Sequence, residues 1–148
     1  MLEVKNLTVR YGKLTIVNNV SFSVKEGQWL MIVGPNGAGK STIINAISQG
    51  VSYTGDVYFE GKNIKKYKPQ NRAKIFGVLA QNNIVSYPFT VGEVIRLGRY
   101  CYAPGIFSHP GKEDEEHILK AVKMTGLEPL LNQSVLTLSG GELRRVFL

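Results

Sequence analysis

The first part of the chain alternates apolar and polar side chains, and this period of two predicts β-strands. The first alternating stretch carries its apolar side chains at Leu2, Val4, Leu7 and Val9. A second alternation covers residues 16–24, and a third covers residues 55–61 and closes in a Glu-Gly turn. Gly12 and Gly27 interrupt the pattern, so we expect turns at both positions.

Two further segments, Trp29–Val33 and Ile75–Leu79, are apolar almost throughout. Short runs without alternation are typical of strands that are buried on both faces of a sheet. We therefore predict a buried strand at each of these two places, in addition to the alternating strands near the N-terminus.

Beyond residue 87 the period changes to that of a helix. Val91–Leu97 places its apolar side chains on one broad face. The acids of Glu113–Glu116 open a second helix, because carboxylates stabilise the positive end of a helix dipole. One side of that helix is lined by Ile118, Ala121, Val122 and Thr125. Shorter helices are predicted over residues 42–47 and 69–74, and a loop over residues 102–111.

The most specific motif is a glycine-rich segment that follows the apolar run at Trp29. It consists of Gly34, Pro35, Asn36, Gly37, Ala38, Gly39, Lys40, Ser41 and Thr42. This segment matches G-x-x-x-x-G-K-[ST], in which a curled backbone and the following helix start point N–H groups at a phosphate. We expect Lys40 to contact the β- and γ-phosphates of a nucleotide and Ser41 to bind Mg²⁺. The alternative, a glycine-rich turn without a ligand, is disfavoured by the predicted strand and helix on either side.

A second motif, Leu138-Ser-Gly-Gly-Glu142, follows the helical region. By itself it predicts a helix start, with Ser139 as the N-cap and Glu142 at the capping-box position three residues later. That interpretation explains the local structure, but it does not explain why the motif follows a phosphate-binding loop about a hundred residues upstream.

Together the two motifs resemble the ATP-binding-cassette (ABC) ATPases, with Leu138–Glu142 as the family signature. Gln81 resembles the glutamine of the family's Q-loop, and Tyr11 resembles the aromatic residue that stacks on adenine. The resemblance spans the whole chain and implies an α/β P-loop fold with an antiparallel β subdomain and an α-helical subdomain. It also implies ATP and Mg²⁺ as cofactors. The residues alone also allow Gln81 as a surface glutamine and Tyr11 as a strand-end side chain packed on the core.

The resemblance further implies an assembly. In the family, two nucleotide-binding domains form a head-to-tail homodimer that holds ATP between the P-loop of one copy and the signature of the other. The nucleotide of a second copy would be contacted by Ser139, Gly140, Gly141 and Glu142. Gln81 would help to hold Mg²⁺ and the attacking water, so Lys40 and Gln81 are the catalytic candidates.

The segment Leu97-Gly-Arg-Tyr100 resembles the subfamily that drives import of iron-siderophores, haem and cobalamin, although Cys101-Tyr-Ala-Pro104 departs from its usual Pro and His. We therefore expect the ATP-binding subunit of an importer, working with separate integral membrane permease subunits. The alternatives are a soluble ABC-type ATPase acting on ribosomes or chromosomes, and a nucleotide-binding remnant without hydrolysis. Only 57 positions separate Gln81 from Leu138, without a heptad repeat, which argues against the coiled-coil chromosome type.

Composition bears on where the protein is located and on what it binds. The 148 residues show no signal-peptide core and no membrane-spanning run, and they include a single cysteine, Cys101. We therefore expect a cytoplasmic protein, peripheral on the inner face of the cell membrane. The net charge is +7, and six of the 18 Lys and Arg lie between Lys62 and Lys74. Such a cluster attracts nucleic acid or anionic lipid, although a solvated basic face is the commoner explanation. Without zinc-ligand spacing or an aromatic platform, no nucleic-acid partner is expected.

The chain ends at Leu148, before the positions at which the family carries its Mg²⁺-binding aspartate, catalytic glutamate and switch histidine. His109 and His117 precede the signature, so neither is the switch. We expect the N-terminal part of one ABC ATPase domain, incomplete at its C-terminus, which hydrolyses ATP very slowly and self-associates through exposed sheet edges. Its expected parts are a β-rich P-loop core over residues 1–82, a helical subdomain over 83–137, and the signature with the following helix over 138–148.

Overall fold

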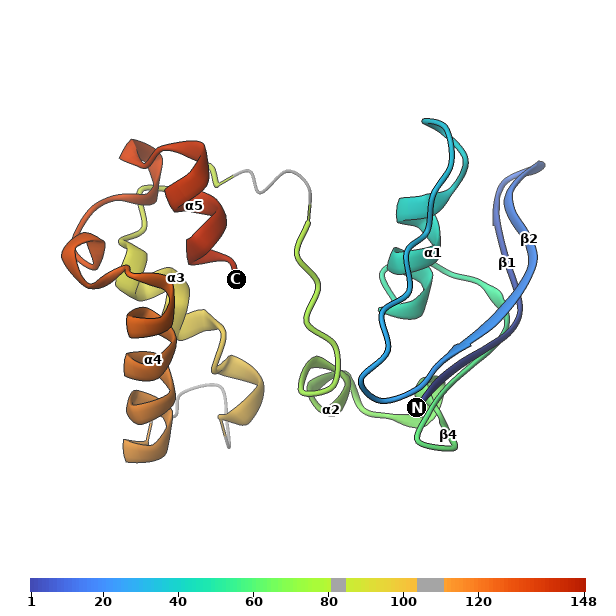
Figure 1. Ribbon diagram of the computed structural model, residues 1–148, viewed down its shortest axis with the longest axis horizontal. Helices are drawn as coiled ribbons and strands as arrows, with labels where there is room; N and C mark the ends of the chain where they lie inside the picture. Colours follow the sequence, from blue (N-terminus) through green and yellow to red (C-terminus); the bar gives the residue numbers. More distant parts are fainter. Residues whose placement is uncertain (81–84, 104–110) are drawn as a thin grey trace. The chain divides into compact units, whose positions relative to one another are not determined.

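The computed structural model describes residues 1–80, 85–103 and 111–148, which form two compact units (Figure 1). Unit 1 is Met1–Phe76 and unit 2 is Gly77–Leu148. Unit 1 contains the β-strands, and unit 2 contains helices. The finer boundaries expected at residues 82 and 137 stay predictions.

Unit 1 is built on a four-stranded antiparallel sheet with the order β2-β1-β3-β4. Its strands are β1 (Leu2–Tyr11), β2 (Leu14–Val24), β3 (Thr54–Phe59) and β4 (Lys62–Asn63). The sequence alternation predicted the first three. The predicted turns are present as well, because Gly12 and Gly27 have φ angles of 58° and 73°, which glycine adopts without a steric penalty.

One face of this sheet packs against helix α1 (Lys40–Ile47). The buried core of unit 1 consists of Val4, Leu7, Val9, Val17, Ile43, Ala46, Ile47, Val57 and Ile64. The odd spacing from Val4 to Leu7 has a structural cause, because the strand register shifts there and Asn6 takes a positive φ of 52°. This irregularity resets the alternation so that both side chains face the core.

Gly55 is the tightest point of the sheet. Its φ is 90°, and a Cβ at this position would collide with the backbone carbonyl oxygens of Lys5 and Asn6 on β1. The close approach of β3 to β1 therefore requires glycine.

The predictions of buried strands at Trp29–Val33 and Ile75–Leu79 are wrong for this structure. Neither segment is a strand, Trp29 is 100% exposed, and Val78 is 49% exposed. A strand forms only where a neighbouring strand accepts and donates its backbone hydrogen bonds. Among the described residues, no strand lies beside either segment, and only Ile32 and Phe76 reach the core of unit 1.

Unit 1 also contains two short helical turns after β4. They are η1 (Ile64–Lys66), capped by the Asn63 side chain, and α2 (Pro69–Ala73), which begins with proline as predicted.

Unit 2 is a small helical cluster. Its elements are α3 (Val91–Leu97), η2 (Tyr100–Tyr102), α4 (Lys112–Thr125), η3 (Glu128–Leu130), η4 (Val135–Thr137) and α5 (Gly140–Val146). They enclose a core of Val91, Val94, Ile118, Val122, Leu127, Val135 and Val146. The helical periodicity predicted α3 and α4, whereas most of the loop expected over residues 102–111 lies outside the described residues. In the described part of the chain, every helix is too short or too polar to cross a membrane.

Three helices of unit 2 begin with a carboxylate that accepts a hydrogen bond from the N-cap backbone. These pairs are Thr90 with Glu93 at 2.7 Å, Gly111 with Asp114 at 3.0 Å, and Ser139 with Glu142 at 2.8 Å. Each carboxylate satisfies a free N–H group and complements the helix dipole.

Candidate functional site

The glycine-rich segment forms a loop that is exposed over residues 34–38 and leads through Gly39 into α1. Gly37 and Gly39 have φ angles of 83° and 84°, in the left-handed region that side chains other than glycine rarely adopt. Left-handed residues of this kind curl the backbone tightly, and curled loops of this type are where backbone N–H groups form anion-binding nests. The loop therefore has the backbone geometry that an anion-binding site needs.

Gly39 also anchors the loop to the sheet. It is buried, and a Cβ at this position would lie 2.9 Å from the carbonyl oxygen of Ile16 and 3.2 Å from Cγ2 of Val17. Gly39 is the N-cap of α1, and its carbonyl accepts the hydrogen bond of the Ile43 N–H at 3.0 Å. The sheet thus fixes where α1 begins and where its positive end lies.

Lys40 closes the loop. Its Nζ donates hydrogen bonds to the carbonyl oxygen of Gly34 at 2.8 Å and to that of Pro35 at 2.7 Å. These two bonds hold an ammonium charge against the loop, where a phosphate oxygen would also meet the N–H groups of α1. The arrangement combines a full positive charge with a helix N-terminus, and it suits a phosphate group.

Ser41, the second residue of α1, is exposed beside Lys40. In the described ranges, no group of three or more His, Cys, Asp or Glu is arranged to hold a metal ion. Magnesium is commonly bound by few protein oxygens together with phosphate oxygens. The Ser41 hydroxyl is a donor of the right kind for such a site, so the residues present are compatible with Mg²⁺ accompanying a nucleotide.

Tyr11 ends β1 and pairs across the hairpin with Leu14. Leu14 belongs to β2, and Gly39 lies against Ile16 and Val17 of that strand. Strand β2 therefore brings Tyr11 and Gly39 to one end of the sheet. The Tyr11 side chain is 54% exposed, which does not fit the alternative that it packs on the core. Gln81, the Q-loop candidate, lies outside the described residues.

The second motif starts α5 in unit 2. Ser139 Oγ lies 2.6 Å from Oε2 of Glu142 and donates to it, while the Glu142 N–H faces Ser139 Oγ at 3.4 Å. The hydrogen bonds from the Ser139 hydroxyl and N–H hold the pKa of the Glu142 carboxyl below its usual value. Gly140 and Gly141 are exposed, and a Cβ on either would meet no atom within 4 Å.

The same capping box occurs at α3, where Thr90 and Glu93 make equivalent hydrogen bonds of 2.7, 2.9 and 3.2 Å. The geometry at Ser139 is therefore the geometry of a helix start. What distinguishes the second motif is its pair of open glycines, since α3 has Val91 and Gly92 at these places and both are buried.

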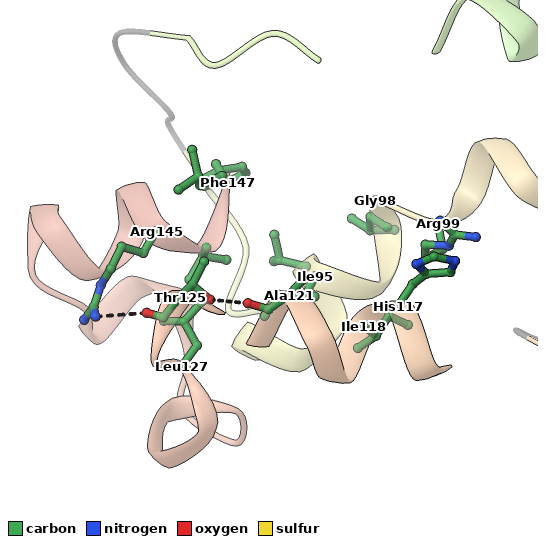
Figure 2. A pocket seen from close by; sticks show the side chains of 14 residues that line it. Ile95, Gly98, Arg99, His117, Ile118, Ala121, Thr125, Leu127, Arg145 and Phe147 are labelled. Carbon is green, nitrogen blue, oxygen red and sulfur yellow. Dashed lines mark hydrogen bonds between the residues drawn. The ribbon is translucent and has the colours of Figure 1, made fainter. Parts of the chain in front are cut away.

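Unit 2 also has a groove of about 500 Å³ between α3, α4 and α5 (Figure 2). Ile95, Ile118 and Leu127 give it an apolar lining, and Arg145 donates a 3.0 Å hydrogen bond to the Thr125 carbonyl along one side. The sequence pattern does not predict this groove, because its walls come from three separate helices.

Arg99, near one end of this groove, forms a 2.8 Å ion pair with Asp114, and its guanidinium lies 3.8 Å from the centre of the Tyr102 ring. The Arg99 hydrogen bond is the main cause of a lowered pKa at Asp114. Nothing in the sequence pattern pointed to this pair, since its members are 15 positions apart.

Comparison with known proteins places the whole chain among ATP-binding proteins. Residues 17–148 match the family described as ABC transporter. The ferric enterobactin transport ATP-binding protein FepC of Escherichia coli (strain K12) is 39% identical, over 97% of this chain and 53% of the relative. The hemin import ATP-binding protein HmuV of Rhizobium leguminosarum is 41% identical, over 99% of this chain and 54% of the relative. The chain thus spans about half the length of these curated relatives.

Solved structures show the same fold. The dimeric structure of MJ0796, a bacterial ABC transporter cassette, matches with a TM-score of 0.79 and 30% identity, over 99% of this chain and 67% of that one. A second structure of this cassette, dimeric and bound to ADP and Pi, matches with a TM-score of 0.78 and 30% identity over the same shares. The expected α/β P-loop cassette fold is therefore confirmed.

Proposed function

This chain belongs to the ABC transporter family, and from that premise we propose that it is the ATP-binding part of a subunit that powers an ABC importer. The observation that supports this most strongly is the loop at residues 34–40. There, two glycines with left-handed φ angles and the Lys40 ammonium group, which donates two hydrogen bonds to loop carbonyls, lie at the start of α1. This geometry supports a site for the phosphates of a nucleotide, and no other feature of the described residues offers a comparable one.

Each residue of the site has a chemical role in the proposal. Lys40 exchanges its bonds to the loop carbonyls for bonds to the β- and γ-phosphates, and its charge stabilises the charge that develops on phosphoryl transfer to water. The N–H groups of the loop hold the phosphates in position, which lowers the entropic part of the barrier. Tyr11 offers an exposed ring on which adenine stacks. Ser41 would hold the Mg²⁺ that accompanies the nucleotide, with Gln81 as a second ligand that also orients the water.

In this proposal a second copy of the chain completes the nucleotide-binding site. Ser139, Gly140 and Gly141 of one copy contact the γ-phosphate bound to Lys40 of the other, in a symmetric pair. For this, Ser139 must release its hydroxyl from Glu142, whose carboxylate accepts it in the present structure. The dimeric ABC cassettes among the structural neighbours support the arrangement.

The cargo class follows from the relatives. FepC is named for ferric enterobactin transport and HmuV for hemin import. We propose that this chain serves import of an iron-siderophore, haem or a related chelate, through separate permease subunits at the inner face of the membrane. A soluble ABC-type ATPase acting on ribosomes or chromosomes is the less favoured candidate, because the relatives reported above are transport subunits.

Nucleotide binding tests the core of the proposal. A fluorescent ATP analogue with Mg²⁺ should bind the chain, and Lys40→Ala should weaken binding at least about tenfold, because a charge-assisted phosphate contact is lost. Lys13→Ala is the control, since it removes the same charge from an exposed position in the same unit but outside the loop. Equal binding by Lys40→Ala and the control would overturn the assignment of the loop.

The role of the second motif needs a separate test. Ser139→Arg should abolish association driven by a non-hydrolysable ATP analogue and leave nucleotide binding to the single chain intact. Thr90→Arg removes the same kind of helix cap from α3 and provides the control. If both variants associate equally well, the second motif has no part in the dimer; if Ser139→Arg loses nucleotide binding itself, the motif acts within one chain.

A further inference from the structure

The net charge of the protein is carried entirely by unit 1. Eleven of the 18 basic residues and four of the 11 acidic residues lie in Met1–Phe76, whereas unit 2 has seven of each. The net charge of +7 therefore belongs to unit 1, and unit 2 is neutral overall. Six of these basic residues fall within residues 62–74, a segment that contains no acid.

These six side chains share one short piece of structure, which we call the basic segment: β4, η1 and α2, residues 62–74. Its backbone is fixed by the Asn63 cap on Lys65 and by the 3.1 Å hydrogen bond from Arg72 to the carbonyl of Tyr67. In Figure 1, β4 and α2 lie at the base of unit 1, and the loop that leads into α1 lies at its top. The basic segment is thus separate from the proposed nucleotide site.

Two of the lysines stand over aromatic rings. Lys62 Nζ lies 4.3 Å from the centre of the Tyr67 ring, and Lys65 Nζ lies 4.3 Å from that of Tyr53. Cation–π contacts of this kind keep the ammonium groups in place while one face of each ring is covered. A nucleic-acid surface would instead leave its aromatic faces open for stacking with bases.

Two other lysines of the segment extend into solvent. Lys66 and Lys68 are exposed, and no described carboxylate forms an ion pair with either. The nearby Asp56 carboxylate accepts a 2.7 Å hydrogen bond from Asn63. Lysine is a flexible point charge, suited to a diffuse anionic surface, whereas arginine is preferred where one phosphate is held in a defined geometry. The one arginine of the segment, Arg72, is half-buried and bonded to the backbone.

We propose that the basic segment is a contact surface for an anionic membrane, which the exposed lysines bind through lipid phosphate and carboxylate groups. Clusters of four to eight Lys or Arg that are held near a membrane, beside a spanning helix or on an amphipathic helix, bind acidic lipid headgroups in this way. The surface adds to the proposed permease contact and does not depend on it, since the attraction needs neither nucleotide nor a protein partner. It gives a reason for a positive charge confined to one unit.

The test is cosedimentation of the chain with vesicles, without nucleotide. We expect binding to phosphatidylcholine vesicles that contain about one third phosphatidylserine, and at least about tenfold weaker binding to pure phosphatidylcholine. Binding to the acidic vesicles should be lost in about 0.5 M NaCl, because salt screens exposed charges. Equal binding to both vesicle types would show an apolar contact and overturn the proposal.

A pair of double variants locates the surface. Lys66→Gln with Lys68→Gln should weaken binding to acidic vesicles about tenfold or more, on the scale expected for two lysines near an anionic surface. Lys13→Gln with Lys25→Gln removes the same charge from exposed sites in the same unit and should change binding far less. Circular dichroism of both variants checks that the fold is retained.

Three further results would contradict the proposal. Equal losses in the two double variants would mean that only the total charge matters. Preferential binding of a single-stranded RNA at the same salt, lost in the Lys66/Lys68 variant, would make the segment a nucleic-acid surface. Loss of vesicle binding in Lys40→Ala, the variant expected to weaken nucleotide binding under the proposed function, would mean that the vesicles bind at the loop before α1 and not at the basic segment. Retained vesicle binding by Lys40→Ala separates the two proposals.

Discussion

The two units have similar lengths, but they are stabilised in different ways. Unit 1 depends on backbone geometry that only glycine allows, as at Gly39 against β2 and at Gly55 against β1. Unit 2 depends on side-chain carboxylates that begin its helices, Glu93, Asp114 and Glu142. The proposed phosphate site therefore lies in the unit whose backbone leaves little room for substitution. The signature-like helix lies in the part where stability depends on charge.

The largest effect is expected when a methyl group is added to Gly55 in unit 1. Gly55→Ala should cost on the order of 3 kcal/mol of unit 1 stability, because a left-handed φ and two carbonyl collisions combine. Chemical denaturation followed residue by residue in NMR spectra measures this, and the resonances of unit 2 should keep their midpoint.

Gly12→Ala is the control for that substitution. Gly12 has a positive φ of 58°, but a Cβ there would meet nothing within 4 Å, so only the conformational strain remains, about 1 kcal/mol. Equal costs at the two positions would show that the close approach of β3 to β1 is unimportant.

A smaller effect is expected when a cap is removed in unit 2. Thr90→Ala and Ser139→Ala should each cost about 1 kcal/mol, because one helix loses an N-cap hydrogen bond. The loss should appear in unit 2 resonances alone. Thr137→Ala, which removes a hydroxyl bonded to the Ser134 carbonyl outside these capping boxes, is a suitable comparison and should cost less. A larger loss in unit 1 than in unit 2 would contradict the division.

Acid should weaken unit 2 by protonating the same carboxylates. The pKa values of Glu93 and Glu142 are lowered by hydrogen bonds from Thr90 and Ser139, and that of Asp114 by Arg99. A lowered folded-state pKa means that the stabilisation is complete above the ordinary carboxyl pKa and is lost as pH falls through the folded value. The denaturation midpoint of unit 2 should therefore fall as the pH is lowered through this range, and denaturation followed by NMR at several pH values measures the change. Glu142→Gln, which keeps a hydrogen-bond acceptor, should reduce the pH dependence at α5.

The smallest expected effect is that of salt. Because unit 1 carries the whole net charge of +7, its like charges repel, and screening them should raise its stability by a few tenths of a kcal/mol. Unit 2, with equal numbers of acids and bases, should respond weakly or lose stability as its ion pairs are screened. Denaturation midpoints of the two units at low and high NaCl concentration check this, and a stronger response in unit 2 would contradict it.

Local pattern predicted the parts of the fold that depend on local chemistry. The alternation of Val4, Leu7 and Val9 with polar residues placed β1, and the spacing of Ser139 and Glu142 placed the start of α5. The glycine-rich loop before α1 was predicted for the same reason, since its glycines act through their own backbone and Lys40 bonds to carbonyls five and six positions earlier.

The rest depended on partners that a local pattern does not name. Trp29–Val33 and Ile75–Leu79 have the composition of strands, but no described strand pairs with them. The Arg99–Asp114 ion pair joins positions far apart in the sequence, and the groove of unit 2 arises only when three helices pack. An apolar composition indicates that a segment tends to be buried. Which segment packs against it is decided by the tertiary structure.

Trp29 is the only tryptophan of the chain, and it stands fully in solvent five positions before the phosphate loop. The intrinsic fluorescence of the protein therefore comes from one indole in water, with red-shifted emission that acrylamide quenches freely. Any strand, second copy or lipid that covers the apolar run should move this emission to shorter wavelength. The chain thus carries its own optical reporter beside the site where nucleotide is proposed to bind, and no label has to be introduced.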